Sequence, residues 1–169
     1  TLPAIALGVE PVEEGIMKRK PRGKKSNFFS GGVASSIIYQ GILEGILVLG
    51  AYQIGLHVGP HVDNPTMQHG DALTMAFLTL GLIQLFHAIN SKYIHQSIFS
   101  KHTFANKWFN GAIIIAALIM SAVELPFMTK FFDVTELDGA QWLVVLIAGI
   151  CMILIVEIVK FFQRKAGKE

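Results

Sequence analysis

Four long apolar runs constrain the fold of this chain more than any other feature of its sequence. They span residues 31–56, 72–90, 108–127 and 140–162, and each is about 19 to 26 residues long. A helix of about 20 residues crosses the ~30 Å hydrocarbon core of a bilayer, and a backbone in lipid must satisfy its own polar groups. The runs therefore predict an all-α integral membrane protein with four transmembrane helices.

The composition favours lipid as the main partner of the chain. Only 15% of the residues are charged, against about 25% in soluble domains, and the mean hydropathy is positive. The net charge of +2 is too small to indicate a nucleic-acid partner. Cys151, the single cysteine, excludes an internal disulfide and is interpreted as a small apolar residue of the fourth run.

Basic residues are distributed unequally between the two sides that four crossings would define. The side with both termini carries thirteen of the fourteen Lys and Arg residues, and Lys130 alone lies opposite. The positive-inside rule makes the richer side, and hence both termini, cytoplasmic. A basic cluster at residues 18–25 could also suggest nucleic-acid binding, but its position just before the first run favours a loop at the membrane surface.

The start of the chain and its loops suggest a segment of a longer protein. Residues 1–8 are apolar, but no basic region precedes them and no cleavage site follows, so they do not form a signal peptide. The loops between the runs are short, and no Asp-Lys-Thr-Gly-Thr phosphorylation motif or phosphate-binding glycine loop is present. We therefore expect this segment to bind no cofactor and to hydrolyse no ATP by itself.

The first run carries two features that suggest contact with another helix. Gly41 and Gly45 form a small-x-x-x-small pattern, which allows close approach of a second backbone. Glu44 lies between them in mid-membrane, where a carboxylate is costly and often functional. It could belong to an ion or proton site, or it could pair with a polar group of a neighbouring helix.

Polar residues in the other runs allow similar alternatives. Gln84, His87 and Asn90 are three residues apart, so neighbours in this set share a helix face. Their oxygen and nitrogen atoms could bind a cation, although hydrogen bonding between helices explains them more simply. Glu157 and Lys160 are interpreted as a local ion pair near a membrane interface.

Two parts of the sequence resemble the calcium-type P-type ATPases. Residues 1–8 read TLPAIALG, Pro11 follows, and residues 16–22 read IMKRKPR, which is similar to the end of transmembrane helix six and the next cytoplasmic loop of that family. Residues 138–143 (DGAQWL) and 157–161 (EIVKF) resemble its last helix. The resemblance extends over essentially the whole chain and makes the four runs helices seven to ten of a ten-helix membrane domain.

The resemblance implies a division of the chain and a set of partners. Residues 1–30 would be the end of helix six and a basic cytoplasmic loop, and residues 31–169 would be the C-terminal transmembrane domain. The parent would be a Ca²⁺-transporting translocase of the cell membrane that uses ATP and Mg²⁺. Its upstream helices and phosphorylation domain would be the partners of this segment, and the latter would face a coupling loop that contains Pro11, Lys18, Arg19, Pro21 and Arg22.

Gln84 departs from the family pattern. The resemblance aligns it with a helix-eight glutamate that binds Ca²⁺ in the two-site pumps of sarcoplasmic reticulum. An amide offers an oxygen but no charge to offset a divalent ion, so we expect one high-affinity site, or an altered one, in the parent. The substitution leaves Na⁺ or Mn²⁺ open as the transported ion. Other classes are a stand-alone four-helix channel or transporter and a peripheral adaptor on anionic lipid.

Overall fold

The structure is a computed structural model that describes residues 2–10, 17, 29, 33–92 and 104–165. Within these ranges all regular structure is helical. The helices are α1 (Leu2–Leu7), α2 (Val33–Gly55), α3 (Pro65–Ser91), α4 (Lys107–Ala122), α5 (Pro126–Phe132) and α6 (Gly139–Lys165). The prediction of an all-α chain is confirmed.

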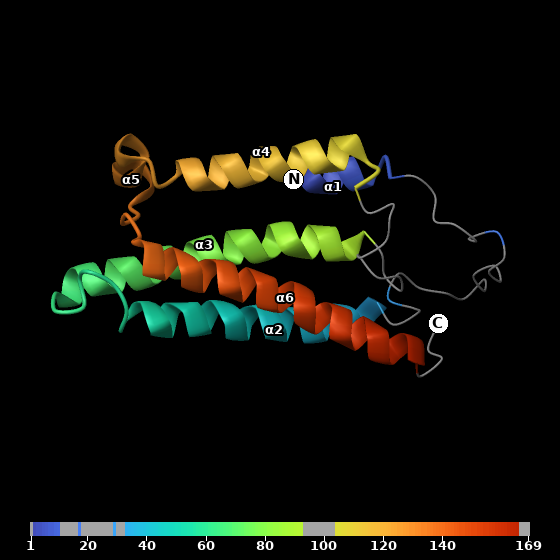
Figure 1. Cartoon of the computed structure of the whole chain (residues 1–169), viewed down its shortest axis with the longest axis horizontal. Coiled ribbons are helices and arrows are strands. Elements are labelled where there is room, and N and C mark those ends of the chain that lie inside the picture. The colour runs from blue at the N-terminus through green and yellow to red at the C-terminus, as the bar shows by residue number, and fades with distance from the viewer. Residues whose placement is uncertain (1, 11–16, 18–28, 30–32, 93–103, 166–169) are drawn as a thin grey trace.

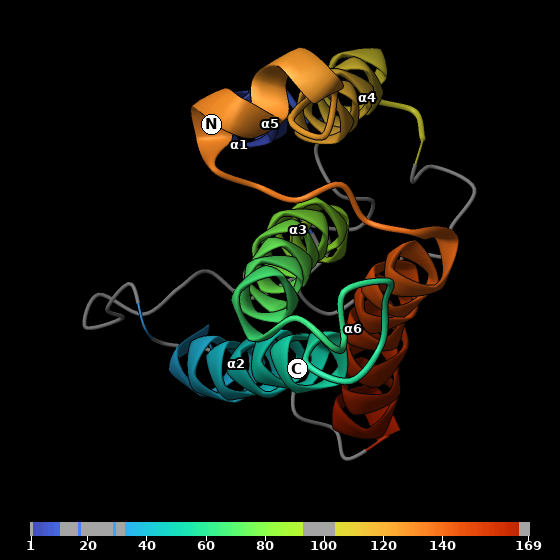
Figure 2. The ribbon, with the colours of Figure 1, turned by 90° about the vertical axis from the view of Figure 1, so that its left-hand side faces the viewer.

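Helix α3 is the centre of the arrangement. It packs against both α2 and α6, and these two also contact each other. Helix α4 contacts α3 less extensively and packs beside the short α1. Figures 1 and 2 show α2, α3 and α6 as one group, with α1, α4 and α5 beside it.

Helices α2, α3 and α6 are each long and apolar enough to cross a membrane. The start of α3 lies seven residues before the predicted residue 72, because Asn64 caps the helix and Pro65 occupies its first turn. Hydropathy detects only the apolar part of such a helix and misses the polar turns that extend beyond the hydrocarbon. The structure thus confirms three predicted spans and lengthens one.

The third predicted span is not one continuous helix. Helix α4 ends at Ala122, and α5 begins at Pro126 with its axis bent by 85° from that of α4. Proline lacks a backbone donor and crowds the preceding turn, so the helix ends before it. The prediction of a single helix over residues 108–127 is wrong after Ala122, and a fourth span requires that the bent pair cross the membrane together.

Two small apolar clusters hold α3 to its neighbours. Met75 and Leu78 of α3 pack with Val145 of α6, and one or two turns further along Ile83 packs with Met152 and Val156 of α6. Glycine allows the backbones of α2 and α3 to approach closely, since a Cβ on Gly55 would lie 2.7 Å from the Cα of Ala72. These contacts fix the rotation of α2 and α6 about their axes relative to α3.

Many large apolar side chains remain exposed on the outer faces of the helices. Ile42 and Ile46 of α2 and Leu118 of α4 are each at least 60% exposed. A water-soluble protein rarely exposes so much contiguous apolar surface. This distribution is the one expected for helices that contact lipid or further membrane helices.

Candidate functional site

The two polar residues singled out in mid-membrane contact each other. The side-chain amide of Gln84 on α3 donates a hydrogen bond to Oε1 of Glu44 on α2, with a donor–acceptor distance of 2.5 Å. Glu44 is half-buried and Gln84 is exposed. The simpler interpretation of both residues, a hydrogen bond between helices, is therefore confirmed, whereas a role in ion binding stays a prediction.

The glycines beside this pair have no close neighbour in the described part of the chain. A Cβ on Gly41 or on Gly45 would meet no atom within 4 Å, and both residues are exposed. They therefore do not mediate packing among α2, α3 and α6. An open glycine surface next to a carboxylate leaves room for a further helix.

A half-open cavity with a mostly apolar exposed lining lies where α2 begins and where α3 and α6 end. Its volume is about 360 Å³, and its polar lining includes Ser36 and Gln40 of α2, His87 and Asn90 of α3, and Lys160 of α6. Lys160 donates to the backbone oxygen of Asn90 at 2.8 Å.

The predicted Glu157–Lys160 ion pair is confirmed, and it is buried. The Lys160 ammonium lies 3.4 Å from Oε1 of Glu157, with side-chain exposures of 4% and 10%. Its position near a membrane interface stays a prediction. The packing of α6 on α3 covers the pair, and the bond from Lys160 to the end of α3 holds the two helices together.

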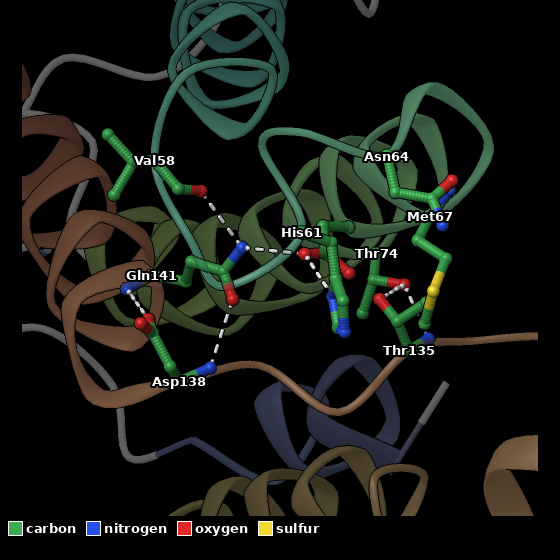
Figure 3. A network of polar contacts seen from close by, with 9 residues as sticks. Val58, His61, Asn64, Met67, Thr74, Thr135, Asp138 and Gln141 are labelled. Carbon is green, nitrogen blue, oxygen red and sulfur yellow. Dashed lines mark hydrogen bonds and ion pairs between the residues drawn. The ribbon is translucent and has the colours of Figure 1, made fainter.

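A second polar network lies at the opposite end of α3. Asp71 is 1% exposed, and its Oδ2 accepts hydrogen bonds from Gln141 of α6 at 3.3 Å and from His61, as an imidazole donor, at 3.0 Å. Gln141 also donates to the backbone oxygen of Val58 at 3.0 Å and exchanges bonds with Asp138. Figure 3 shows the Gln141 amide between Val58 and Asp138.

This network fastens the α2–α3 loop to the start of α6. Gly59 lies within the loop at φ 133°. A few residues away, the Thr74 hydroxyl accepts from the backbone N–H of Thr135 at 3.0 Å. Sequence reasoning missed the network, although the Asn64-Pro65 helix start and the DGAQW motif at residues 138–142 mark both of its sides.

Glu124, near the break between α4 and α5, has one partner from the last helix. The indole N–H of Trp142 donates to its Oε2 at 2.7 Å, while its Oε1 is buried without a partner in the described chain. The bond connects the bent segment to the start of α6.

A third polar cluster ties the segment after α1 to the α3–α4 connection. The Lys92 ammonium, whose side chain is completely buried, lies 2.9 Å from Oε1 of Glu10. Asn106 donates to Oε2 of Glu10 at 2.8 Å and to the backbone oxygen of Ala6 at 3.1 Å. Glu10 lies within the predicted coupling loop, directly before Pro11.

The remaining predicted site residues cannot be compared with the structure. The described residues do not include Pro11, Lys18, Arg19, Pro21 or Arg22. The predicted boundary at residue 30, between the loop and the transmembrane domain, also lies outside them. In the part that is described, no group of three or more His, Cys, Asp or Glu side chains could hold a metal ion. Oxygen ligands from elsewhere would have to complete any cation site at Glu44 and Gln84.

Comparison with known proteins identifies the class of this membrane segment. The family described as "Cation transporting ATPase, C-terminus" matches residues 1–162. The chain therefore belongs to this family, as its resemblance to P-type ATPases predicted.

Individual relatives give the same result. The chain is 30% identical to a calcium-transporting ATPase of Listeria monocytogenes over 99% of its length, and 33% identical to calcium-transporting ATPase 1 of Bacillus cereus over 97%. A calcium-transporting ATPase of Bacillus subtilis is 32% identical over 86% of the chain. The chain spans between 16% and 20% of the length of these relatives.

Proposed function

We propose that this chain is the C-terminal membrane scaffold of an ATP-driven cation pump, with Ca²⁺ as the transported ion. The single observation that carries the scaffold role is the Glu44–Gln84 pair at the outer surface of α2 and α3, beside Gly41 and Gly45. The relatives named for calcium transport support the choice of ion.

The position of the pair argues for a partner made of protein. A carboxylate in the hydrocarbon core costs at least about 2.5 kcal/mol and normally faces a bundle interior or a water-filled cavity. Glu44 is only half-buried and its partner Gln84 is exposed, so contact of the pair with lipid would leave the carboxylate with that cost. Upstream helices of the same pump would cover the pair and use the two glycines for close approach.

The cytoplasmic role is assigned to the segment around Glu10. Its contacts with Lys92 and Asn106 anchor the start of the coupling loop. The loop itself would contact the phosphorylation domain, where ATP and Mg²⁺ act. Both termini would be cytoplasmic, and the pump would lie in the cell membrane.

Substitution of the glycines in the full-length protein tests the scaffold role. Gly41→Leu and Gly45→Leu should each reduce ATP-dependent Ca²⁺ uptake into vesicles and impair assembly with the upstream helices. Gly50→Leu is the matched control. A Cβ on Gly50 would also meet no atom within 4 Å, but Gly50 lies on the opposite face of α2 from Gly41. Equal effects at all three positions would contradict docking through the Gly41–Gly45 surface.

A cation panel with Gln84→Glu tests the ion assignment. The new carboxylate would lie against Glu44, and two carboxylates at hydrogen-bonding distance require a shared proton or a bound cation. The variant should therefore change the apparent Ca²⁺ affinity or the number of ions moved per ATP. ATPase activity at varied concentrations of Ca²⁺, Na⁺ and Mn²⁺ measures this. If Gln84→Glu leaves the dependence on all three cations unchanged, Gln84 serves only in packing between helices.

A further inference from the structure

Helix α5 lies across the end of α4 and does not continue it. The two axes are bent by 85° from each other. Figure 1 shows α4 running alongside α3, and Figure 2, viewed from the end of the bundle, shows α5 crossing the end of α4. The 16 residues of α4 rise about 24 Å, which is most of a ~30 Å hydrocarbon core. If α4 crosses with the other helices, α5 therefore lies close to the boundary of the core and roughly parallel to the membrane plane.

Hydrogen bonds fix the chain on both sides of α5. Before it, Glu124 accepts a hydrogen bond from the indole of Trp142 on α6. After it, the backbone N–H of Thr135 donates to the hydroxyl of Thr74 on α3. Between these two bonds, Asp133 ends α5 in the left-handed conformation, with φ 54°. The bundle therefore holds α5 at its angle to α4.

The outward face of α5 is aromatic and basic. Phe127 and Phe131 are four residues apart, so they share a face, and they are 72% and 81% exposed. Phe132 packs edge-to-face on Phe131 with ring centroids 5.2 Å apart. Lys130 is also exposed and lies about 60° around the helix from Phe127. Aromatic rings beside a lysine are typical of segments at the level of the lipid headgroups.

We propose that α5 is an interfacial anchor in the leaflet on the side of the membrane where α3 begins. The rings of Phe127 and Phe131 lie below the lipid phosphates, and the ammonium of Lys130 binds a phosphate group. The proposal goes beyond the scaffold role, since it involves neither the glycine surface of α2 nor the transported ion.

Three observations favour lipid over a further protein segment as the partner of α5. The exposed apolar surface of α4, which includes Leu118 and Ile119, continues along the chain through Leu125 to α5. The seven residues of α5 rise only about 10 Å, which leaves little length for packing against another helix. The positive charge of Lys130 matches the lipid phosphates.

Such an anchor would set the depth of α4 in the bilayer. Helix α4 contacts α3 less extensively than α2 and α6 do, and its main neighbour among the described helices is the short α1. A helix with few protein contacts can tilt or slide along its axis. An aromatic segment at its end opposes both movements, because they would bring the buried rings into water.

Fluorescence quenching in the full-length protein tests the depth of α5. In a cysteine-free background, bimane is attached to Phe131→Cys, and the protein is reconstituted into vesicles of phosphatidylcholine and phosphatidylglycerol. Lipids brominated near the top of their acyl chains should quench this label about threefold more than bimane on Glu136→Cys, and iodide on both sides should quench it about threefold less. Glu136 is the matched control because it is exposed in the segment between α5 and α6.

The other outcomes of this experiment would overturn the anchor. Strong quenching by iodide at both positions would mean that α5 lies in water. Weak quenching of the Phe131→Cys label by both agents would mean that protein covers it. Phe127→Cys gives the same measurement on the same face if Phe131→Cys fails to fold.

Substitution of Lys130 in the labelled protein tests the phosphate contact. Lys130→Glu would bring a negative charge against the phosphates, so quenching of the Phe131→Cys label by brominated lipid should fall about twofold in these vesicles. Lys130→Arg keeps the charge and should leave the quenching unchanged. Equal quenching in the two variants would refute the binding of a phosphate by Lys130.

Discussion

Replacement of Gly59 by alanine should destabilise the end of the bundle where α2 meets α6. The residue has φ 133°, a backbone conformation that residues with a Cβ rarely adopt. A Cβ at this position would lie 2.2 Å from Nε2 of Gln141 and 2.9 Å from its Cδ. Either the loop or the Gln141 side chain must move.

The cost follows from two separate effects. Backbone strain for a non-glycine residue in this region is about 1–3 kcal/mol. Displacement of Gln141, which is fully buried, would also remove its bonds to Val58 and Asp71, and leaving one buried polar group unsatisfied costs about 1–3 kcal/mol. Together they predict a loss of roughly 2–6 kcal/mol for Gly59→Ala.

Thermal denaturation of the detergent-solubilised full-length protein, followed by fluorescence-detected size exclusion, measures the effect. Gly59→Ala should lower the midpoint by several degrees, whereas Gly139→Ala should leave it almost unchanged, because a Cβ there meets nothing within 4 Å. When Gln141 is already replaced by alanine, Gly59→Ala can no longer displace its side chain. The further loss of stability should then equal the backbone strain alone. Equal midpoints for the two glycine variants, or no coupling to Gln141, would refute the reasoning.

Two further predictions concern contacts between helices. Gly55→Ala should cost about 1–3 kcal/mol because its Cβ would lie 2.7 Å from the backbone of Ala72, so α2 and α3 must separate; Gly50→Ala, which has open space, should be nearly neutral in the same thermal assay. Trp142→Phe removes the indole donor from a carboxylate near the α4–α5 break and should cost about 1–3 kcal/mol. Trp108→Phe is its control because Trp108 is 80% exposed, and similar midpoints for both tryptophan variants would contradict a structural role for the indole bond.

The membrane character of the chain could be predicted from the sequence because hydropathy is a local property. Runs of 19 to 26 apolar residues indicate helices of spanning length without knowledge of any contact. The same locality explains the errors. Residues 65–71 are too polar to count in such a run but continue the helix after the Asn64 cap, and Pro126 interrupts a run that hydropathy treats as continuous.

The candidate site could be predicted only in part. Glu44 and Gln84 were recognised individually, since polar residues in an apolar run are conspicuous, but they are 40 positions apart and their hydrogen bond was one alternative among several. Asp71 and Gln141, 70 positions apart, were not connected at all. Neither residue lies in the middle of an apolar run, so composition gave no reason to pair them.

The sequence by itself determined that the chain forms apolar helices and which family it belongs to, because both are carried by the order of residues along the chain. Only the tertiary structure decided which polar side chains meet. That depends on the rotation and axial position of each helix, and these are set by close packing such as that of Gly55 against Ala72 and of Gly149 against Phe86. A rotation of one residue, about 100°, would move Gln84 away from Glu44.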